Sequence, residues 1–196
     1  HKRLAAFGPA GPGAIYRIEV TTGRAREWAR VPAPGANRHT GVPRDPDEVA
    51  RDWAGKTSLG GVDVDLDETE LAGMNLYARR IFRYAVPSGA LLGDFAHGAV
   101  TETWAADARP FAVKYHDGRL YHGVVNSAES SQSRAALRGY VYSSLPDGSD
   151  MRKVADFPLD YPRSVARLPG VIGSAGDQDV PLDWRPWRDG DNDLAS

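Results

Sequence analysis

Three aspartates at alternate positions, Asp63, Asp65 and Asp67, have the spacing with which an EF-hand loop begins its set of Ca²⁺ ligands. That loop also needs glycine at its sixth position and glutamate at its twelfth, where this chain has Glu68 and Met74. If the segment is instead an extended strand, the three carboxylates share one face. The alternatives are therefore a Ca²⁺ site and a row of solvated or pore-facing acids.

Asn75, Asn126 and His122 are the other polar residues that could bind a ligand. The two asparagines occur late in the second strand of two repeated units, at places from which a divalent ion over a central pore would take ligands. Hydrogen bonds within turns explain asparagine at such places equally well. His122 has no histidine partner at the spacing of a zinc site, so a structural role is its alternative.

Two repeated units organise the middle of the chain and must position these residues. In residues 56–98, apolar residues alternate with acids from Gly61 to Leu66, and three further short apolar runs follow with turn residues between them. Residues 109–159 repeat the pattern, and Asp117-Gly118 marks the turn of the first hairpin. Four antiparallel strands in about 40 residues are typical of a β-propeller blade. We therefore predict an all-β, β-propeller-like array of four-stranded antiparallel blades.

The flanking regions extend this array. Residues 4–32 form a partial blade, because Ile15–Gly23 matches Ile81–Gly89 in its Ile, aromatic, Arg, Val and Gly positions. An acidic first turn after a proline predicts a short inserted helix over residues 46–54. Residues 160–196 have no periodicity and contain four prolines, so we expect a Pro- and Asp-rich tail that leads towards missing blades.

About three blades do not close a ring, since closed propellers have about four to eight. We therefore expect residues 1–160 to be part of a larger propeller, completed by further blades or by another copy of the chain. Trp184 and Trp187 in the tail would anchor that junction, because two buried aromatic rings contribute strongly at an interface.

Composition narrows the classes of partner. A net charge of −2 gives no electrostatic reason to expect nucleic acid or an anionic membrane as partner. The chain has no cysteine, which excludes disulfides. No apolar run approaches the roughly 20 residues that span a bilayer, so we expect no membrane span.

The stretches Gly55–Val64 and Leu71–Phe82 resemble a blade of the propeller-like domains of large bacterial cell-surface proteins, which often carry serine-aspartate-repeat-type B modules. Arg109–Val113 with Leu120–Val125 resembles their next blade. The segment Phe157–Pro162 and the Trp184-Arg185-Pro186-Trp187 pair of tryptophans are also similar. The resemblance covers residues 10–190, and its motifs are structural rather than catalytic.

This resemblance implies a non-catalytic propeller module of a secreted or cell-surface bacterial protein, which acts in adhesion or binding or as a scaffold. A protein or carbohydrate surface ligand would suit such a module. Gly-x-Ser-x-Gly, Walker and Gly-x-Gly-x-x-Gly motifs are absent from the sequence. The alternative is a propeller enzyme, a lactonase-like hydrolase or a lyase, with a divalent ion at the central pore. No cofactor is expected apart from Ca²⁺ at the three aspartates.

Overall fold

The computed structural model of the chain describes residues 8–38, 53–168 and 178–189. These residues form twelve β-strands and two short 3₁₀ turns, which confirms the all-β prediction. The elements in chain order are β1 (Ala14–Glu19), β2 (Arg24–Arg30), β3 (Leu59–Val64), β4 (Glu70–Asn75), β5 (Arg80–Ala85), β6 (Leu91–Ala96), η1 (Ala105–Asp107), β7 (Ala108–His116), β8 (Arg119–Asn126), η2 (Arg134–Ala136), β9 (Arg138–Ser144), β10 (Arg152–Pro158), β11 (Pro162–Leu168) and β12 (Gln178–Asp183). No helix among the described residues is long and apolar enough to cross a membrane.

Two four-stranded antiparallel sheets, β3-β4-β5-β6 and β7-β8-β9-β10, form the centre of the molecule. Each is a meander whose tight turns follow from its sequence. Asp65 closes the β3–β4 turn by accepting hydrogen bonds from the N–H groups of Thr69 (2.7 Å) and Glu70 (3.0 Å). Asp117 and Gly118 have φ of 46° and 70°, the left-handed conformation that a two-residue hairpin turn needs. The prediction of four-stranded antiparallel units is therefore confirmed.

Two hairpins flank these sheets, β1–β2 before them and β11–β12 after them. The second hairpin corrects the expectation that residues 160–196 lack regular structure. In β3–β4 and β7–β8 the first strand carries an extra residue in a bulge, between Leu59 and Val62 and between Pro110 and Val113. The first strand of β11–β12 carries the same extra residue, between Pro162 and Ser164, so this hairpin corresponds to the first two strands of a sheet.

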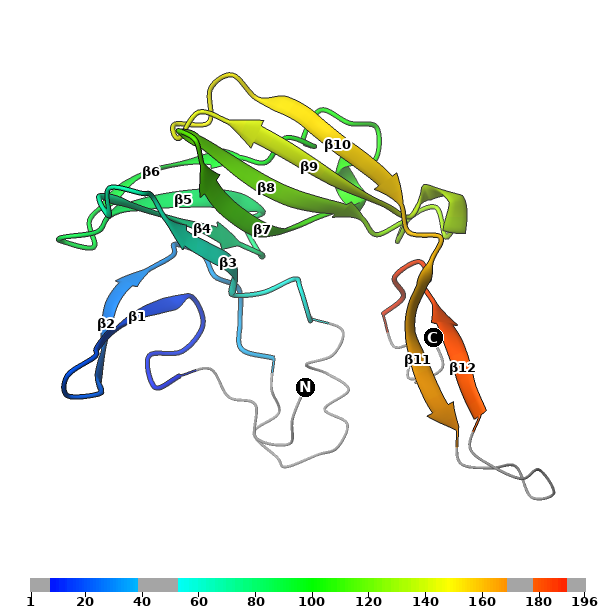
Figure 1. Cartoon of the computed structure of the whole chain (residues 1–196), viewed down its shortest axis with the longest axis horizontal. Coiled ribbons are helices and arrows are strands. Elements are labelled where there is room, and N and C mark those ends of the chain that lie inside the picture. Colours follow the sequence, from blue (N-terminus) through cyan, green and yellow to red (C-terminus); the bar gives the residue numbers. More distant parts are fainter. Residues whose placement is uncertain (1–7, 39–52, 169–177, 190–196) are drawn as a thin grey trace.

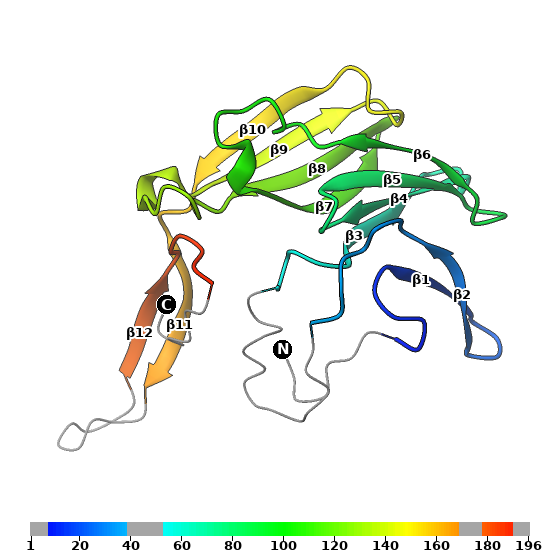
Figure 2. The ribbon, with the colours of Figure 1, turned by 180° about the vertical axis from the view of Figure 1, so that it is seen from behind.

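Figures 1 and 2 show the four sheets following one another as an arch, with β1–β2 at one end and β11–β12 at the other. The β1–β2 hairpin packs on one face of the β3–β6 sheet, and β7 and β8 pack on its other face. The first of these clusters contains Ile15, Ala29, Val31, Leu71, Phe82 and Tyr84. The second contains Ala72, Met74, Leu76, Ile81, Val113 and Leu120.

The first strands of the two central sheets, β3 and β7, lie against each other without sharing a backbone ladder. Gly60 permits this approach, because a Cβ at that position would lie 2.4 Å from the carbonyl oxygen of Phe111. The carboxylate of Asp63 bridges the two strands, since it accepts hydrogen bonds from the backbone N–H of Tyr115 (2.8 Å) and from Lys114 Nζ (3.0 Å). The sheets thus come closest where Gly60 has no side chain and the carboxylate of Asp63 forms hydrogen bonds between them.

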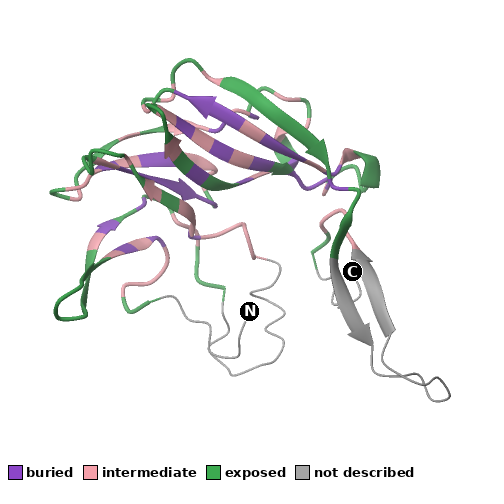
Figure 3. Cartoon of the chain, in the orientation of Figure 1, coloured by how far each residue is buried: buried purple, intermediate pink, exposed green. Residues whose placement is uncertain are grey.

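Burial differs sharply between corresponding strands (Figure 3). Every residue of β4 from Leu71 to Asn75 is buried, because both faces of its sheet are covered. In β8 only alternate residues are fully buried, so one face of the β7–β10 sheet is open. Every residue of β10 is exposed.

The inserted helix predicted over residues 46–54 falls almost wholly on residues outside the described part of the chain. Trp53 is described, lies in a turn and is half-buried. In the Ser-rich loop over residues 127–138, the single turn η2 is the only regular element.

Candidate functional site

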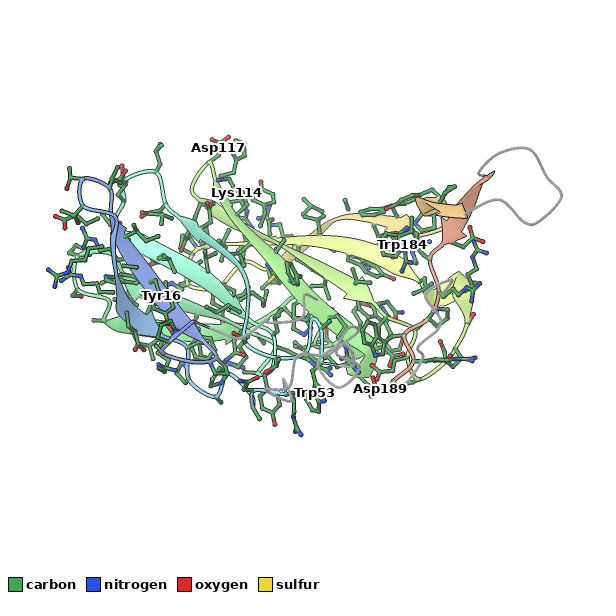
Figure 4. The ribbon with its side chains drawn as sticks, turned by 90° about the horizontal axis from the view of Figure 1, so that it is seen from below. Tyr16, Trp53, Lys114, Asp117, Trp184 and Asp189 are labelled. Carbon is green, nitrogen blue, oxygen red and sulfur yellow. The ribbon has the colours of Figure 1, made fainter. Side chains whose placement is uncertain are left out.

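The segments that precede the first strand and follow the second strand of each sheet gather at one edge of the molecule, which we call the loop face (residues 53–58, 75–79, 105–109, 126–133 and 184–189). Figure 4 shows Trp53 and Asp189 at this edge, with Lys114 and Asp117 at the opposite edge. The meander topology causes this gathering, because the second strand of each sheet ends beside the start of the first. Sequence-distant loops therefore meet here.

Asn75, at the end of β4, is completely buried. Its Nδ2 donates to the carbonyl oxygens of Pro32 (2.7 Å) and Ala33 (3.2 Å), and its Oδ1 accepts from the N–H groups of Tyr77 and Ala78, both at 3.0 Å. These four bonds use the whole hydrogen-bonding capacity of the amide. Asn75 joins the segment after β2 to the turn after β4, as the turn-stabilising alternative supposes.

Asn126 has the equivalent place at the end of β8, and its Oδ1 accepts from the N–H of Ala128 (2.9 Å). Beside it, the buried carboxylate of Asp107 accepts from the N–H (3.0 Å) and the hydroxyl (2.6 Å) of Ser130. The carbonyl oxygen of Asp107 accepts from the hydroxyl of Ser127 at 2.9 Å. The beginning of the Ser-rich loop is thus fixed to η1.

Lys56 lies at the centre of a charge network on the loop face. Its Nζ is 2.9 Å from Glu129 Oε1 and 2.8 Å from Asp189 Oδ1, and only 15% of its side chain is exposed. The Arg109 guanidinium also donates to Glu129, so this carboxylate bridges two cations. The hydrogen bond from Lys56 holds the pKa of Asp189 below its usual value, and the Trp187 Nε1 donates to the same carboxylate at 2.7 Å.

Aromatic rings accompany these charges. Lys56 Nζ lies 5.1 Å from the centre of the Trp187 ring, and the Arg38 guanidinium lies 4.2 Å from that of Trp53. Both distances are within the range of a cation–π contact. Tyr77 is 52% exposed at the turn between β4 and β5, and its ring borders this surface.

Arg79 in the same turn donates to the carbonyl oxygen of Ala106 at 2.8 Å. Burial, and secondarily the charge of Arg109, lowers the pKa of Arg79. The loop face contains five cationic residues and three acidic ones, and this excess of positive charge favours acidic groups in a ligand.

His122 lies inside the molecule, stacked on Tyr142 with ring centres 5.7 Å apart. Its Nε2 accepts from the N–H of Gly98 at 2.9 Å, so its ring proton is on Nδ1, which is buried without a partner. Burial lowers the pKa of His122 to about 4, and the neighbouring His97 adds to this. Burial and the charge of Arg79 lower the pKa of His97 to about 4 as well. Both rings are therefore neutral at physiological pH.

The three aspartates predicted as Ca²⁺ ligands are not brought together. Asp63 bridges β3 and β7, and Asp65 caps the β3–β4 turn, in which Asp67 is an exposed residue. Among the described residues, no three His, Asp or Glu side chains are grouped so that they could hold a metal ion.

The two tryptophans of the tail pack on the chain itself. Trp184 contacts the cluster of Ala128, Leu137 and Leu159, and its Nε1 is buried with no hydrogen-bond partner among the described residues. The Trp187 N–H donates to the carbonyl oxygen of Ser127 at 3.0 Å. Both residues therefore fasten the segment after β12 to the Ser-rich loop.

Sequence reasoning placed Asn75 and Asn126 at equivalent positions, but it missed Lys56, Glu129 and Arg109. Lys56 is separated by 73 residues from Glu129 and by 133 from Asp189. No local pattern marks a pair so distant in sequence. The repeat alignment was the only available signal, because it brings the ends of the second strands to one edge. No protein family matches the sequence, and no curated protein is significantly similar to it.

Proposed function

We propose that the chain is a non-catalytic module of propeller-type blades, which binds a protein or carbohydrate ligand with its loop face and serves as a scaffold. Successive four-stranded meanders packed face to face, with their first strands adjacent, support the propeller arrangement. The setting in a secreted or cell-surface bacterial protein is proposed from the resemblance of residues 10–190.

The observation that carries the binding role is the clamp formed by Lys56, Glu129, Arg109 and Asp189. It holds four sequence-distant segments together through charge-assisted hydrogen bonds. The side chains of Lys56, Arg109 and Glu129 are mostly shielded from water, whereas that of Asp189 is 60% exposed. A loop surface fixed in this way loses little conformational freedom when it binds, which favours affinity. The same charged groups are already paired with one another, an arrangement suited to holding loops rather than to transferring protons.

The exposed groups beside the clamp indicate the kind of ligand. Tyr77 is exposed, Trp53 and Trp187 are half-buried, and Lys56 lies against the Trp187 ring. Aromatic and arginine side chains dominate the energetics of protein interfaces, and aromatic faces also stack on flat apolar groups. A sugar ring bearing acidic substituents, or an acidic protein loop, fits this chemistry.

A binding screen tests the proposal directly. The purified chain is applied to an array of glycans and to a panel of purified extracellular proteins, together with the variants Tyr77→Ala, Lys56→Gln and Asp117→Asn. Any ligand of the loop face should bind Tyr77→Ala and Lys56→Gln more weakly, by on the order of tenfold. Asp117→Asn, a conservative change at the opposite edge, should bind as the wild type does.

Two results would contradict the proposal. A ligand whose binding depends on Asp117 but not on Tyr77 or Lys56 would place the contact surface elsewhere. Turnover of lactones that requires an added divalent ion would identify the chain as an enzyme instead.

A further inference from the structure

We propose that two copies of the chain complete each other: the β1–β2 hairpin of one copy forms a blade with the β11–β12 hairpin of the other and covers the open face of its β7–β10 sheet. The inference rests on the propeller arrangement in the proposed function, but not on the ligand-binding role. Its partner is a second copy of this chain.

The first contact surface is the open face of the β7–β10 sheet. On this face Phe111 is 56% exposed, and Val125 is 36% exposed. The β3–β6 sheet shows what such a face becomes when it is covered, because residues 71–75 of β4 are all buried there. Buried residues alternate with less buried ones in β8, so one face of this sheet resembles the faces of the β3–β6 sheet but is not covered by another sheet.

The second contact surface is the outer face of the β1–β2 hairpin. Ile18 and Val20 correspond to Tyr84 and Val86 in the matching repeat Ile81–Gly89. Tyr84 is 2% exposed beneath β1–β2, whereas Ile18 is 61% and Val20 is 95% exposed. In the covered repeat Tyr84 is buried and Val86 is half-buried, so an exposed isoleucine and valine at these positions indicate a missing neighbour on this side of the hairpin.

The two hairpins at the ends are complementary in strand position. The hairpin β11–β12 carries the extra residue of its bulge in its first strand, as β3–β4 and β7–β8 do. The hairpin β1–β2 carries it in its second strand, as β5–β6 and β9–β10 do, so it matches the third and fourth strands of a sheet. The hairpin β11–β12 of one copy and β1–β2 of another would therefore make up one blade. The twelve described strands amount to three blades of four. Two copies then give six, within the range of about four to eight blades in closed propellers.

Charge favours the same pairing of unlike ends. The β1–β2 hairpin from Ala14 to Arg30 contains four arginines and two glutamates, a net charge of +2. The β11–β12 hairpin from Pro162 to Asp183 contains three aspartates and two arginines, a net charge of −1. The β1–β2 hairpin of one copy therefore attracts the β11–β12 hairpin of another, whereas two β1–β2 hairpins repel each other. A contact between two different surfaces, one on each copy, forms a closed ring when the rotation that relates neighbouring copies allows it. Two copies form the smallest ring of this kind.

Light scattering after size-exclusion chromatography measures the association. The wild type should have twice the mass of the 21.2 kDa chain. Ile18→Asp at one end and Phe111→Asp at the other should each reduce the association, because each places a charge in the contact. Both residues are exposed within the chain, so each variant should keep the strand signal in circular dichroism. Leu66→Asp, at a residue 97% exposed in the β3–β4 turn, is the matched control and should remain a dimer.

Mixing the two variants separates contact between unlike ends from any other association. The Ile18→Asp copy keeps an intact β7–β10 face, and the Phe111→Asp copy keeps an intact β1–β2 hairpin, so an equimolar mixture should recover one contact and form heterodimers. A wild type that stays at the mass of one chain at every concentration overturns the proposal and leaves loop-face binding untouched. Dimers abolished by only one of the two substitutions would show contact between like ends, which also overturns it.

Discussion

Asn75 and Asn126 occupy the same place in successive sheets but differ in how many hydrogen bonds depend on them. The amide of Asn75 satisfies two carbonyl oxygens and two N–H groups, whereas the side chain of Asn126 accepts from one N–H within the described part of the chain, that of Ala128. Buried groups that lose their partner cost more than the hydrogen bond itself contributes. Asn75 and Asn126, which look alike in the sequence, therefore contribute unequally to the stability of the fold.

Asn75→Ala should lower the free energy of unfolding by about 2–4 kcal/mol, because it leaves several buried backbone groups unsatisfied. Asn126→Ala should cost only about 1 kcal/mol. Urea unfolding of the two variants and the wild type measures both values. Equal losses would mean that the four bonds of Asn75 do not act together.

The two buried histidines predict a pH dependence of stability. The unfolded chain takes up protons on these rings below pH 6.5, whereas the folded chain does so only near pH 4, because burial lowers both pKa values. The free energy of unfolding should therefore fall as the pH decreases through this window, by about 1.4 kcal/mol per pH unit for each histidine. Above the window this contribution is fully present.

His122→Gln should reduce that slope by the share of one histidine, as measured by urea unfolding at several pH values. His116→Asn is the matched control, because His116 is exposed at the end of β7. If His122→Gln and the wild type had the same slope, the buried ring would not be the group that titrates.

At the scale of elements, the contact between the two central sheets depends on a glycine at the contact and on the carboxylate of Glu70, which accepts hydrogen bonds from both sheets. Glu70 on β4 accepts from Arg83 on β5 through two bonds of 2.7 Å and from the hydroxyl of Tyr115 on β7. Burial and the hydrogen bond to Glu70 raise the pKa of Tyr115. This polar link and the bare backbone of Gly60 together set the distance between the sheets.

Gly60→Ala should destabilise the fold by about 2 kcal/mol or more, since its Cβ would lie 2.4 Å from a backbone oxygen that a side-chain rotation cannot move. Gly123→Ala is the matched control in β8, where the added Cβ would lie 3.6 Å from the Cβ of Ala112 and should change little. Thermal melting of both variants checks the pair. Equal melting temperatures would contradict the close approach of β3 and β7.

The sequence predicts the four-stranded sheets well, because alternation and turn residues are local signals. The strand expected at Gly61–Leu66 is observed at Leu59–Val64, and the one expected at Leu91–Ala96 is observed there. The hairpin β11–β12 escapes prediction, since Pro162 and Pro181 lie within its strands and remove backbone donors. Its register becomes visible only through its likeness to β3–β4 and β7–β8.

The candidate site is predictable only in part. Repeat alignment brings Asn75 and Asn126 to one edge, but their hydrogen-bond partners depend on the loops that pack around them. The Lys56–Glu129 pair joins two loops of different sheets, and such a contact follows from the packing of the sheets rather than from any spacing. The 1-3-5 spacing of Asp63, Asp65 and Asp67 is misleading for the same reason, because their environments are set by β7 and by the turn.

At the scale of the whole molecule, the covered and open faces of the arch decide how the chain is completed. The β3–β6 sheet is enclosed by its neighbours on both faces, whereas the β7–β10 sheet and the β1–β2 hairpin each present one open face. The exposed apolar residues Ile18, Val20 and Phe111 belong to these open faces. A second copy would enclose both faces and leave the loop face accessible to ligand.

Small-angle X-ray scattering of the wild-type chain, recorded directly as it elutes from a size-exclusion column, tests the central claim that these sheets are blades completed around one axis. We predict the scattering of a compact ring with twice the 21.2 kDa mass, and a change to a single open arch in the Ile18→Asp variant. A wild type that scatters as one open arch at all concentrations, with the same profile as Ile18→Asp, would contradict the account.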